Sequence, residues 1–312
     1  MSTAPIDLSK LPPPEIVERI DYEEILFELK AKHVSLYPVD KQAEIAQALA
    51  LESEPINITL QGVAYREFML RQAFNDRARG MLLAFARGGN LEHIAALFDI
   101  ERQTITPADP VNNIAAVMED DDSLLERTQL APQSFTCAGP SGMYVSLARN
   151  ADGQVLDASA ISPDPCHAVV TVLARDGDGT APKSLTDTVY AALNPKTVRP
   201  LCDFVDVQSA KIKKYGVVAE LVFFQGPDRS LSLQSAKTAL AAYVAALRKL
   251  GQAVTLDGIT AVLRVAGVQK VNLSSPTADI ACTLQEATYC ESITVTDGGL
   301  YVPADGDYSE QA

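Results

Sequence analysis

The first hundred residues carry apolar side chains at the spacing of an amphipathic α-helix, without the alternation that marks a strand. The clearest run lies between Leu60 and Ile100. Apolar residues that recur every three or four positions share one helical face, and in this run they are Leu70, Phe74, Ala78, Met81 and Phe85. The pattern predicts a long one-sided helix, which needs a partner surface within this chain or on another.

The end of this helix is predicted at Gly88-Gly89, because glycine readily adopts the left-handed conformation that terminates helices. Asn90 can cap a second, short helix, and Glu92 lies in its first turn near the positive end of the helix dipole. We therefore expect a long helix, a tight glycine corner and a short helix folded back on it.

Two more helices are predicted before this run. One spans Asp21 to Val34, starts with a capping-box-like pair and is broken by Pro38. The next starts at Asp40 and continues to Leu51. Three prolines at positions 12–14 cannot enter a helix interior, so the N-terminal segment is expected to be an extended arm.

The pattern changes near residue 104, where short runs of β-branched residues begin to alternate with helical ones. Residues 104–118 contain two prolines and are expected to be a connector. Gly142–Ala148 suits a strand or a helix edge. Ala168–Leu173 is a predicted strand, followed by a helix at Leu185–Leu193 and a strand at Phe204–Gln208. This order predicts a small sheet with helices on one face.

A second unit of the same kind follows. Its predicted elements are a strand at Tyr215–Phe224, helices at Leu231–Leu250 and Ile259–Val265, and strands at Val268–Leu273 and Ser292–Thr296. The polar, glycine-rich residues from Asp297 onward are expected to form a mobile tail.

The expected fold class is therefore α+β, with an N-terminal all-α helical region followed by two small α+β domains. The predicted boundaries are 1–20 for the extended arm, 21–103 for the helical domain, 104–210 for the first α+β domain, 211–297 for the second, and 298–312 for the mobile tail.

Composition narrows the classes of function. The 312 residues are 47% hydrophobic and 21% charged, which is typical of a globular chain long enough for two or three domains. The formal net charge of −14 argues against nucleic acid or an anionic membrane as the main partner. The sequence has neither an apolar run long enough to span a bilayer nor the features of a signal peptide, so folding in a cytoplasm is expected.

The inventory for catalysis or metal binding is sparse. The five cysteines are scattered and form no Cys-x-x-Cys pair, so neither a disulfide framework nor a zinc site is favoured. The three histidines, His33, His93 and His167, accompany no Gly-x-Ser-x-Gly elbow. The turn at Asp176–Thr180 lacks the later ligands of a calcium loop, and the acidic patch Glu119–Asp122 is expected to be a solvated helix start. We predict no catalytic residue, no cofactor and no metal.

Particular residues follow the order seen in one known family. In the first third these are Glu54-Pro55, Tyr65-Arg66, Leu70-Arg71, Asn75, Leu82-Leu83-Ala84, Ala86, Gly88, Leu91 and Ala95-Ala96. In the middle they are Glu119-Asp120, Leu125-Glu126-Arg127, Phe135, Ala138-Gly139-Pro140, Tyr144, Val155, Asp157, Ser162-Pro163, Pro165 and Val169 through Leu173. The most distinctive later match is Arg199-Pro200-Leu201 with Asp203, Val205 and Val207. In these residues the chain resembles the baseplate J-like family, wedge proteins of contractile phage tails and R-type tailocins. Cys166-His167 stand where the family usually has a glycine.

The resemblance implies a non-enzymatic structural subunit of the baseplate wedge of a contractile phage tail or a phage-derived tailocin (pyocin). Such a subunit joins wedges into a ring around the central hub and relays the conformational change that triggers sheath contraction. Its expected partners are a second copy of itself, a helical wedge protein, the neighbouring wedges, the hub and the sheath. Its expected place is the baseplate of the particle, assembled in the host cytoplasm. The helical bundle with these partners is expected to use the face formed by Leu70, Phe74, Met81 and Phe85.

A second hypothesis comes from a different class of protein: a small-molecule-binding or hydrolytic α+β protein with a helical cap. It requires a pocket that gathers Asp164, Cys166 and His167 with the Asp176–Asp178 turn. Adjacent residues on an extended chain, such as Cys166 and His167, point to opposite faces. The sparse catalytic inventory also speaks against this hypothesis.

Overall fold

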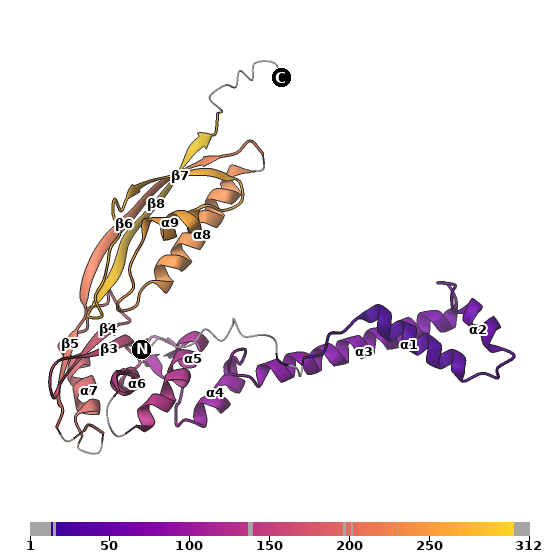
Figure 1. Cartoon of the computed structure of the whole chain (residues 1–312), viewed down its shortest axis with the longest axis horizontal. Coiled ribbons are helices and arrows are strands. Elements are labelled where there is room, and N and C mark those ends of the chain that lie inside the picture. The colour runs from indigo at the N-terminus through magenta and orange to yellow at the C-terminus, as the bar shows by residue number, and fades with distance from the viewer. Residues whose placement is uncertain are drawn as a thin grey trace. The chain divides into compact units, whose positions relative to one another are not determined.

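The computed structural model describes residue 14 and residues 17–136, 140–195, 198–200, 202–226 and 228–302. The chain divides into two compact units, which are described one at a time. The helical unit contains the described residues up to Glu101 together with Asp121–Leu125, and the α+β unit contains Arg102–Asp120 and the described residues from Glu126 onward. Figure 1 labels most of their elements, numbered in chain order.

The helical unit is built around one long helix. Among the described residues, its helices are α1 (Tyr22–Ser35), α2 (Gln42–Ala48), α3 (Pro55–Gly80), α4 (Gly88–Ala96) and the first half of α5 (Asp121–Leu130). α1 begins where predicted, because the Asp21 carboxylate accepts a hydrogen bond from the Glu23 backbone N–H at 2.9 Å.

A small apolar core joins α1 to α3. Ile25 and Leu26 of α1 are buried against Ala64 of α3. Further along α3, the side chain of Asn75 exchanges two hydrogen bonds with the backbone of Glu18, at 3.2 and 2.8 Å. These bonds attach the segment before α1 to α3. Of the predicted arm, residues 1–13, 15 and 16 lie outside the described residues.

The corner between α3 and α4 differs from the prediction. α3 ends at Gly80, eight residues before the predicted glycine stop, and Gly88 is the first residue of α4 with a left-handed φ of 53°. A Cβ atom on Gly80 would lie 2.8 Å from the Asn90 side chain. The missing side chain of Gly80 therefore lets α4 approach, and Asn90 lies inside α4 and does not cap it.

The acidic patch at Glu119–Asp122 is also more than a solvated helix start. In the helical unit, Asp121 accepts a hydrogen bond from the Gly88 N–H at 3.1 Å, and Asp122 forms an ion pair with Arg87 at 3.3 Å. Both carboxylates lie at the start of α4, where the helix dipole favours negative charge.

The α+β unit contains two lobes. The first lobe has the sheet order β3-β4-β5, and its elements are the second half of α5, from Glu126 to Leu130, the 3-10 helix η2 (Ala131–Phe135), α6 (Ser141–Ala151), β3 (Val155–Asp164), β4 (His167–Ala174), α7 (Lys183–Leu193) and β5 (Phe204–Ser209). β3 and β4 are antiparallel, and β4 runs parallel to β5 through the crossover helix α7. Gly142–Ala148 forms part of helix α6. Its buried residues pack with β4 and α7 in the main core of the lobe.

The second lobe has the sheet order β7-β6-β8 and helices on one face. Its elements are β6 (Lys211–Phe223), α8 (Arg229–Ala246), α9 (Leu256–Leu263), β7 (Val268–Ser275) and β8 (Glu286–Leu300). Alternate residues of β6 from Tyr215 to Phe223 are buried under α8 and α9, which is the pattern of a sheet covered on one side.

β8 is much longer than the predicted strand at Ser292–Thr296. It extends by parallel pairing with β6 from Lys211↔Glu286 to Phe223↔Leu300. The strand thus continues past residue 298, where the mobile tail was predicted to begin. Residues 303–312 of that predicted tail lie outside the described residues.

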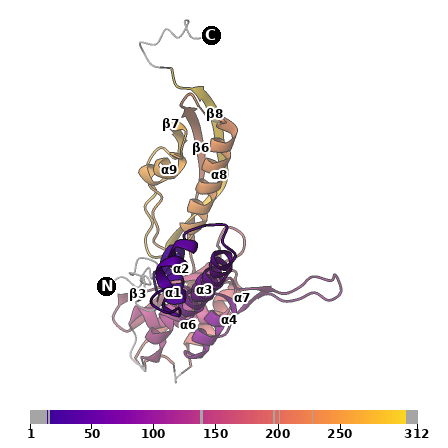
Figure 2. The same cartoon turned by 90° about the vertical axis from the view of Figure 1, so that its right-hand side faces the viewer.

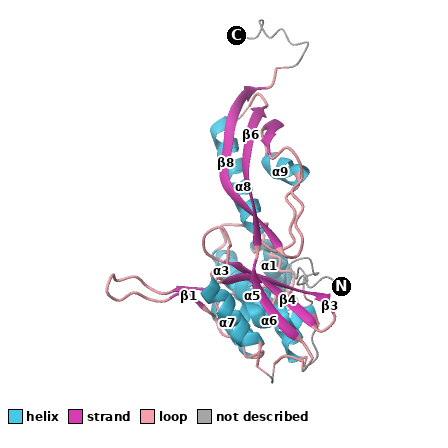
Figure 3. Cartoon of the chain, turned by 90° about the vertical axis from the view of Figure 1, so that its left-hand side faces the viewer, coloured by secondary structure: helices cyan, strands magenta, loops and turns pink. Residues whose placement is uncertain are grey.

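The predicted connector at 104–118 forms a β-hairpin. β1 (Thr104–Thr106) pairs with β2 (Val117–Met118), and an antiparallel bridge joins Asp109 to Ile114 nearer the tip. Figures 2 and 3 show this hairpin projecting away from the helices and strands of the first lobe (Figure 2, Figure 3). Apart from these local differences, the structure confirms the fold class, an all-α region followed by α+β structure.

Candidate assembly surfaces

The four residues predicted to form a partner interface are all exposed within the chain. Their exposed fractions range from 41% for Phe85 to 77% for Met81. Leu70 and Phe74 lie on α3, whereas Met81 caps the end of that helix and Phe85 lies in the turn that follows. They therefore do not share one continuous helical face, because α3 ends earlier than predicted.

Leu70 and Phe74 belong to a longer apolar stripe on α3. Ile56 and Val63 precede them at intervals of seven residues, and all four side chains are exposed. Spacings of seven and four residues bring side chains to one side of a helix, as in a coiled-coil seam. We call Ile56, Val63, Leu70 and Phe74 the first stripe. Its heptad spacing was a sequence signal that would have identified Ile56 and Val63.

A second exposed stripe lies on another side of α3. It consists of Ile58, Tyr65 and Met69, again at spacings of seven and four residues. The side that carries Ala64 is the one covered by α1. At 3.6 residues per turn, the three apolar sides are roughly 100–140° apart. α3 is therefore a helix with one apolar side covered by α1 and two apolar sides exposed.

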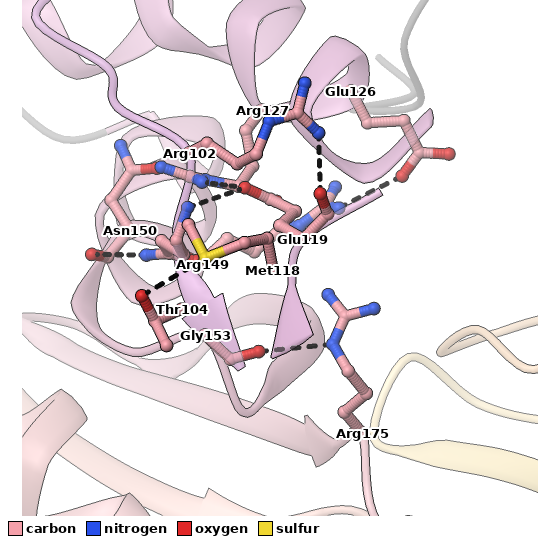
Figure 4. A network of polar contacts seen from close by, with 11 residues as sticks. Arg102, Thr104, Met118, Glu119, Glu126, Arg127, Arg149, Asn150, Gly153 and Arg175 are labelled. Atoms are coloured by element: carbon pink, nitrogen blue, oxygen red, sulfur yellow. Dashed lines mark hydrogen bonds and ion pairs between the residues drawn. The ribbon is translucent and has the colours of Figure 1, made fainter. Parts of the chain in front are cut away.

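The α+β unit contains a buried polar network at the root of the hairpin (Figure 4). Arg127 donates to the Glu119 carboxylate, and both side chains are at most 5% exposed. Arg102 donates to the Glu119 carbonyl oxygen at 2.6 Å, and Arg149 pairs with Glu126 at 3.1 Å. Burial lowers the pKa of Arg127, and the charge of Glu119 opposes that shift. In each of these contacts an arginine binds a carboxylate or a carbonyl oxygen of the same chain. We therefore interpret the network as structural.

Comparisons with known proteins agree with the geometry of a structural subunit. The profile of the Baseplate J-like N-terminal domain matches residues 52–109, and that of the Baseplate J-like protein C-terminal domain matches residues 215–296. The chain is 42% identical to Baseplate protein J of Escherichia phage P2 over 296 residues, which cover 94% of this chain and 98% of that protein. The chain belongs to the baseplate J-like family.

Membership of this family confirms the resemblance read from the sequence and gives the chain a structural role in a baseplate, with no enzymatic activity. The N-terminal match covers α3, α4 and the first strand of the hairpin, whereas the C-terminal match covers most of the second lobe. Among solved structures, the cryo-EM baseplate of the anti-feeding prophage contains a chain with 17% identity and a TM-score of 0.39, covering 60% of this chain and 47% of that one.

Part of the pocket that the alternative hypothesis required is present in the first lobe. Cys166 and His167 border a cavity of about 240 Å³ together with Tyr144 and Asp203. Cys166 has a left-handed φ of 62°, so the backbone at this position is not the extended chain that the sequence argument assumed. The His167 imidazole contacts Asp206 at 2.6 Å.

The remaining parts of that hypothetical pocket lie elsewhere. Asp176 borders a different cavity, beyond the far end of the eight-residue strand β4 from His167. At about 3.3 Å per residue, the length of β4 separates the two by more than 20 Å. Tyr144 donates a hydrogen bond to Asp203 at 2.6 Å, and burial together with Asp203 raises the pKa of the tyrosine. These residues do not assemble the predicted hydrolytic site.

The part of the chain that the structure describes has neither a metal-binding cluster nor a membrane-spanning helix. No group of three His, Cys, Asp or Glu side chains in that part of the chain could hold a metal ion. Within the same residues, no helix has the length and apolarity to cross a membrane.

Proposed function

We propose that this chain is a wedge subunit whose helix α3 forms a bundle with a second copy of the chain and with a helical wedge protein. The α+β units of neighbouring wedges then make contact and close a ring around the central hub. The observation that carries this proposal is α3 itself, which is covered by α1 on one apolar side and exposed on two others.

The energetics favour helical partners for the two exposed stripes. Complete burial of a large apolar side chain stabilises an association by about 1.5–3 kcal/mol. The seven-and-four spacing is the spacing at which side chains of one helix insert between those of another. Two stripes on different sides accommodate two more helices, which is the number that a second copy and one helical partner provide.

The proposed action of the subunit is conformational. Contacts between wedges rearrange when the tail fires, and the rearrangement releases the sheath. The subunit is assembled in the host cytoplasm before it becomes part of the particle. On this proposal the chain acts through non-covalent interfaces that can rearrange, and it catalyses no reaction.

Truncation of Phe74 tests the bundle. We expect Phe74→Ala to weaken binding to the helical tail protein encoded beside this gene, because it removes the aromatic ring from the first stripe. The two proteins are co-expressed, and light scattering gives the mass of the purified complex. The original chain is expected to form a complex of two copies with one partner.

The matched control is Tyr190→Ala, which truncates an exposed aromatic side chain on α7 of the α+β unit. It should bind as the original chain does. Both variants should keep their melting temperatures, since both side chains are exposed in the free chain. Normal assembly by Phe74→Ala would show that the first stripe is not in the bundle. If the original chain binds none of the tail proteins encoded beside this gene, the wedge role is disproved.

A further inference from the structure

The hairpin formed by β1 and β2 is rigidly held at its root. Glu119 N–H donates to the Gln103 carbonyl at 2.9 Å, and the Gln154 side chain donates to the Ile105 carbonyl at 2.9 Å. Gly153 packs so closely beneath β1 that a Cβ atom there would lie 2.8 Å from the Thr104 carbonyl oxygen. The hairpin is thus anchored to the first lobe through its β1 side.

The tip of the hairpin is ordered before any partner binds. Asp109 and Ile114 exchange two backbone hydrogen bonds, each of 2.9 Å. The Asp109 carboxylate also accepts from Val111 N–H at 3.0 Å and from the Asn112 side chain at 2.6 Å. A preorganised loop loses little conformational entropy on binding, so this arrangement favours docking.

The surface of the hairpin is apolar and nearly uncharged. Val111 is 92% exposed, and Ile114, Val117 and Met118 are about half exposed. Between Gln103 and Met118 the only charged residue is Asp109. An exposed arm that carries apolar side chains and almost no charge has the composition of a protein-binding surface.

The second lobe offers a matching acceptor, the outer edge of β8. β8 lies at the edge of its sheet, and no other strand among the described residues pairs with its outer side, where the Glu286 carbonyl accepts a hydrogen bond from Gly251 N–H at 3.0 Å. The segment Ser292–Thr296 provides an open edge of about 17 Å. Proteins usually protect such edges with lysine, proline, bulges or short strands.

The other edge strands carry this protection along their length, whereas β8 carries it as two bulges, one at Glu291 and one between Asp297 and Leu300. β7 contains Lys270, β3 contains Pro163, and β5 has only six residues, one of them Asp206. β8 contains neither lysine nor proline, and its segment Ser292–Thr296, between the two bulges, is uncharged and rich in β-branched residues. Such an edge accepts a strand from another chain.

We propose that the β2 side of the hairpin in one copy pairs with the outer edge of β8 in a second copy. The β1 side already contacts Gln154 of its own chain, so the side of Val117 and Met118 is the one left open. Two copies that each carry a net charge of −14 repel one another, and they can approach through uncharged segments such as Val117–Met118 and Ser292–Thr296.

The proposed contact joins two different surfaces, β2 of one copy and β8 of the next, so the two copies are arranged head to tail. A contact between two different surfaces of one chain, when repeated, generates a ring if the rotation closes. This inference rests on the proposed wedge ring, in which β2 and β8 are the elements that join neighbouring copies. Pairing of β8 with β8 would instead give a closed symmetric pair.

Photo-crosslinking tests the contact on the full chain. Benzoyl-phenylalanine is introduced in place of Val117, and the variant is mixed with unsubstituted chain labelled with heavy isotopes. Mass spectrometry of the irradiated mixture identifies the peptides that become joined. We expect cross-links from the light chain to heavy peptides within Glu286–Val302.

A charge on the edge provides the second variant. Thr294→Lys in the heavy chain should abolish the cross-link, because a lysine at an open edge opposes strand addition. Thr238→Lys on the exposed face of α8 is the matched control and should leave the cross-link in place. Both variants should keep the melting temperature of the original chain.

Three results would overturn the inference: cross-links confined to the chain that carries the probe, cross-links to another part of the second copy, or no cross-link from a folded chain. These outcomes do not depend on the α3 bundle, because the helical partner is absent from the mixture. A chain that fails to bind the helical protein but still cross-links at β8 would contradict the proposed bundle alone.

Discussion

At the scale of single residues, the buried charges of the α+β unit are each compensated by a specific neighbour. Arg127 donates to the Glu119 carboxylate and to the Asn150 side chain, the latter at 2.9 Å. A buried pair of this kind contributes little net stability relative to an apolar replacement. Removal of one partner, however, leaves an uncompensated charge away from water.

The first residue-scale prediction concerns this pair. Glu119→Ala is expected to lower the free energy of unfolding by about 3–5 kcal/mol, because Arg127 stays buried without its carboxylate. Urea denaturation followed by circular dichroism measures the change. Glu67→Ala, which removes the exposed pair of Glu67 with Arg71 on α3, is the control and should cost about 0.5 kcal/mol or less. Equal effects of the two variants would show that burial of the first pair is unimportant.

A second prediction at this scale concerns pH. The Glu286 carboxylate accepts hydrogen bonds from Lys213 at 2.8 Å and from Thr283 N–H at 2.9 Å, and these bonds lower the pKa of Glu286 from 4.5 to about 2. A group whose pKa is lowered by folding stabilises the folded chain above its unfolded pKa, and this contribution disappears as the pH falls through the folded pKa.

We therefore expect Glu286→Gln to melt at a lower temperature than the original chain at neutral pH. The difference should shrink as the pH falls from 4.5 towards 2. Thermal melts across this range measure it. Asp187→Asn, which breaks an exposed pair with Lys183, serves as the control. A difference that stays constant with pH would mean that the charge of Glu286 is not what stabilises this site.

At the scale of the elements, α1 shows how adjacent residues can have separate roles. Leu26 is buried against α3, whereas Phe27 is 72% exposed. Truncation to alanine at Leu26 removes a side chain that packs within the chain. The same truncation at Phe27 removes one that is exposed and available to a partner.

The prediction is that Leu26→Ala destabilises the helical unit by about 2–5 kcal/mol, the usual cost of a truncated core leucine. Phe27→Ala should change the stability of the free chain by no more than about 0.5 kcal/mol. Denaturation of the chain alone measures both. A larger loss for Phe27→Ala would show that Phe27 is packed in the free chain.

At the scale of the whole molecule, the two lobes of the α+β unit are joined by polar and apolar contacts at once. Lys249 pairs with Glu126, and Leu250 N–H donates to Asp157 at 2.9 Å. Leu173 of the first lobe packs with Leu250 and Ala287 of the second. The lobes are also covalently close, because only Ala210 separates β5 from β6. The joint between the lobes therefore combines an ion pair, a hydrogen bond, apolar packing and a short covalent connection.

The sequence by itself determined the order and type of most elements and the family of the chain. Helical spacing, β-branched runs and glycine or proline punctuation are local signals, and they are read over a few residues. The same locality explains the errors. Gly88-Gly89 satisfies the local rule for a helix stop, but α3 ends at Gly80, where the absence of a Cβ atom allows Asn90 to pack.

Only the tertiary structure decided which apolar residues are covered and which strands lie at an edge. The full length of β8 depends on its pairing with β6, more than sixty residues away in sequence. The hairpin at 104–118 is likewise held by Gln154 and Gly153. Ala64 and Val63 are adjacent in the sequence and both apolar, yet only the packing of α1 distinguishes the buried side from the exposed one. Burial and strand pairing are set by contacts between distant segments, which local patterns do not contain.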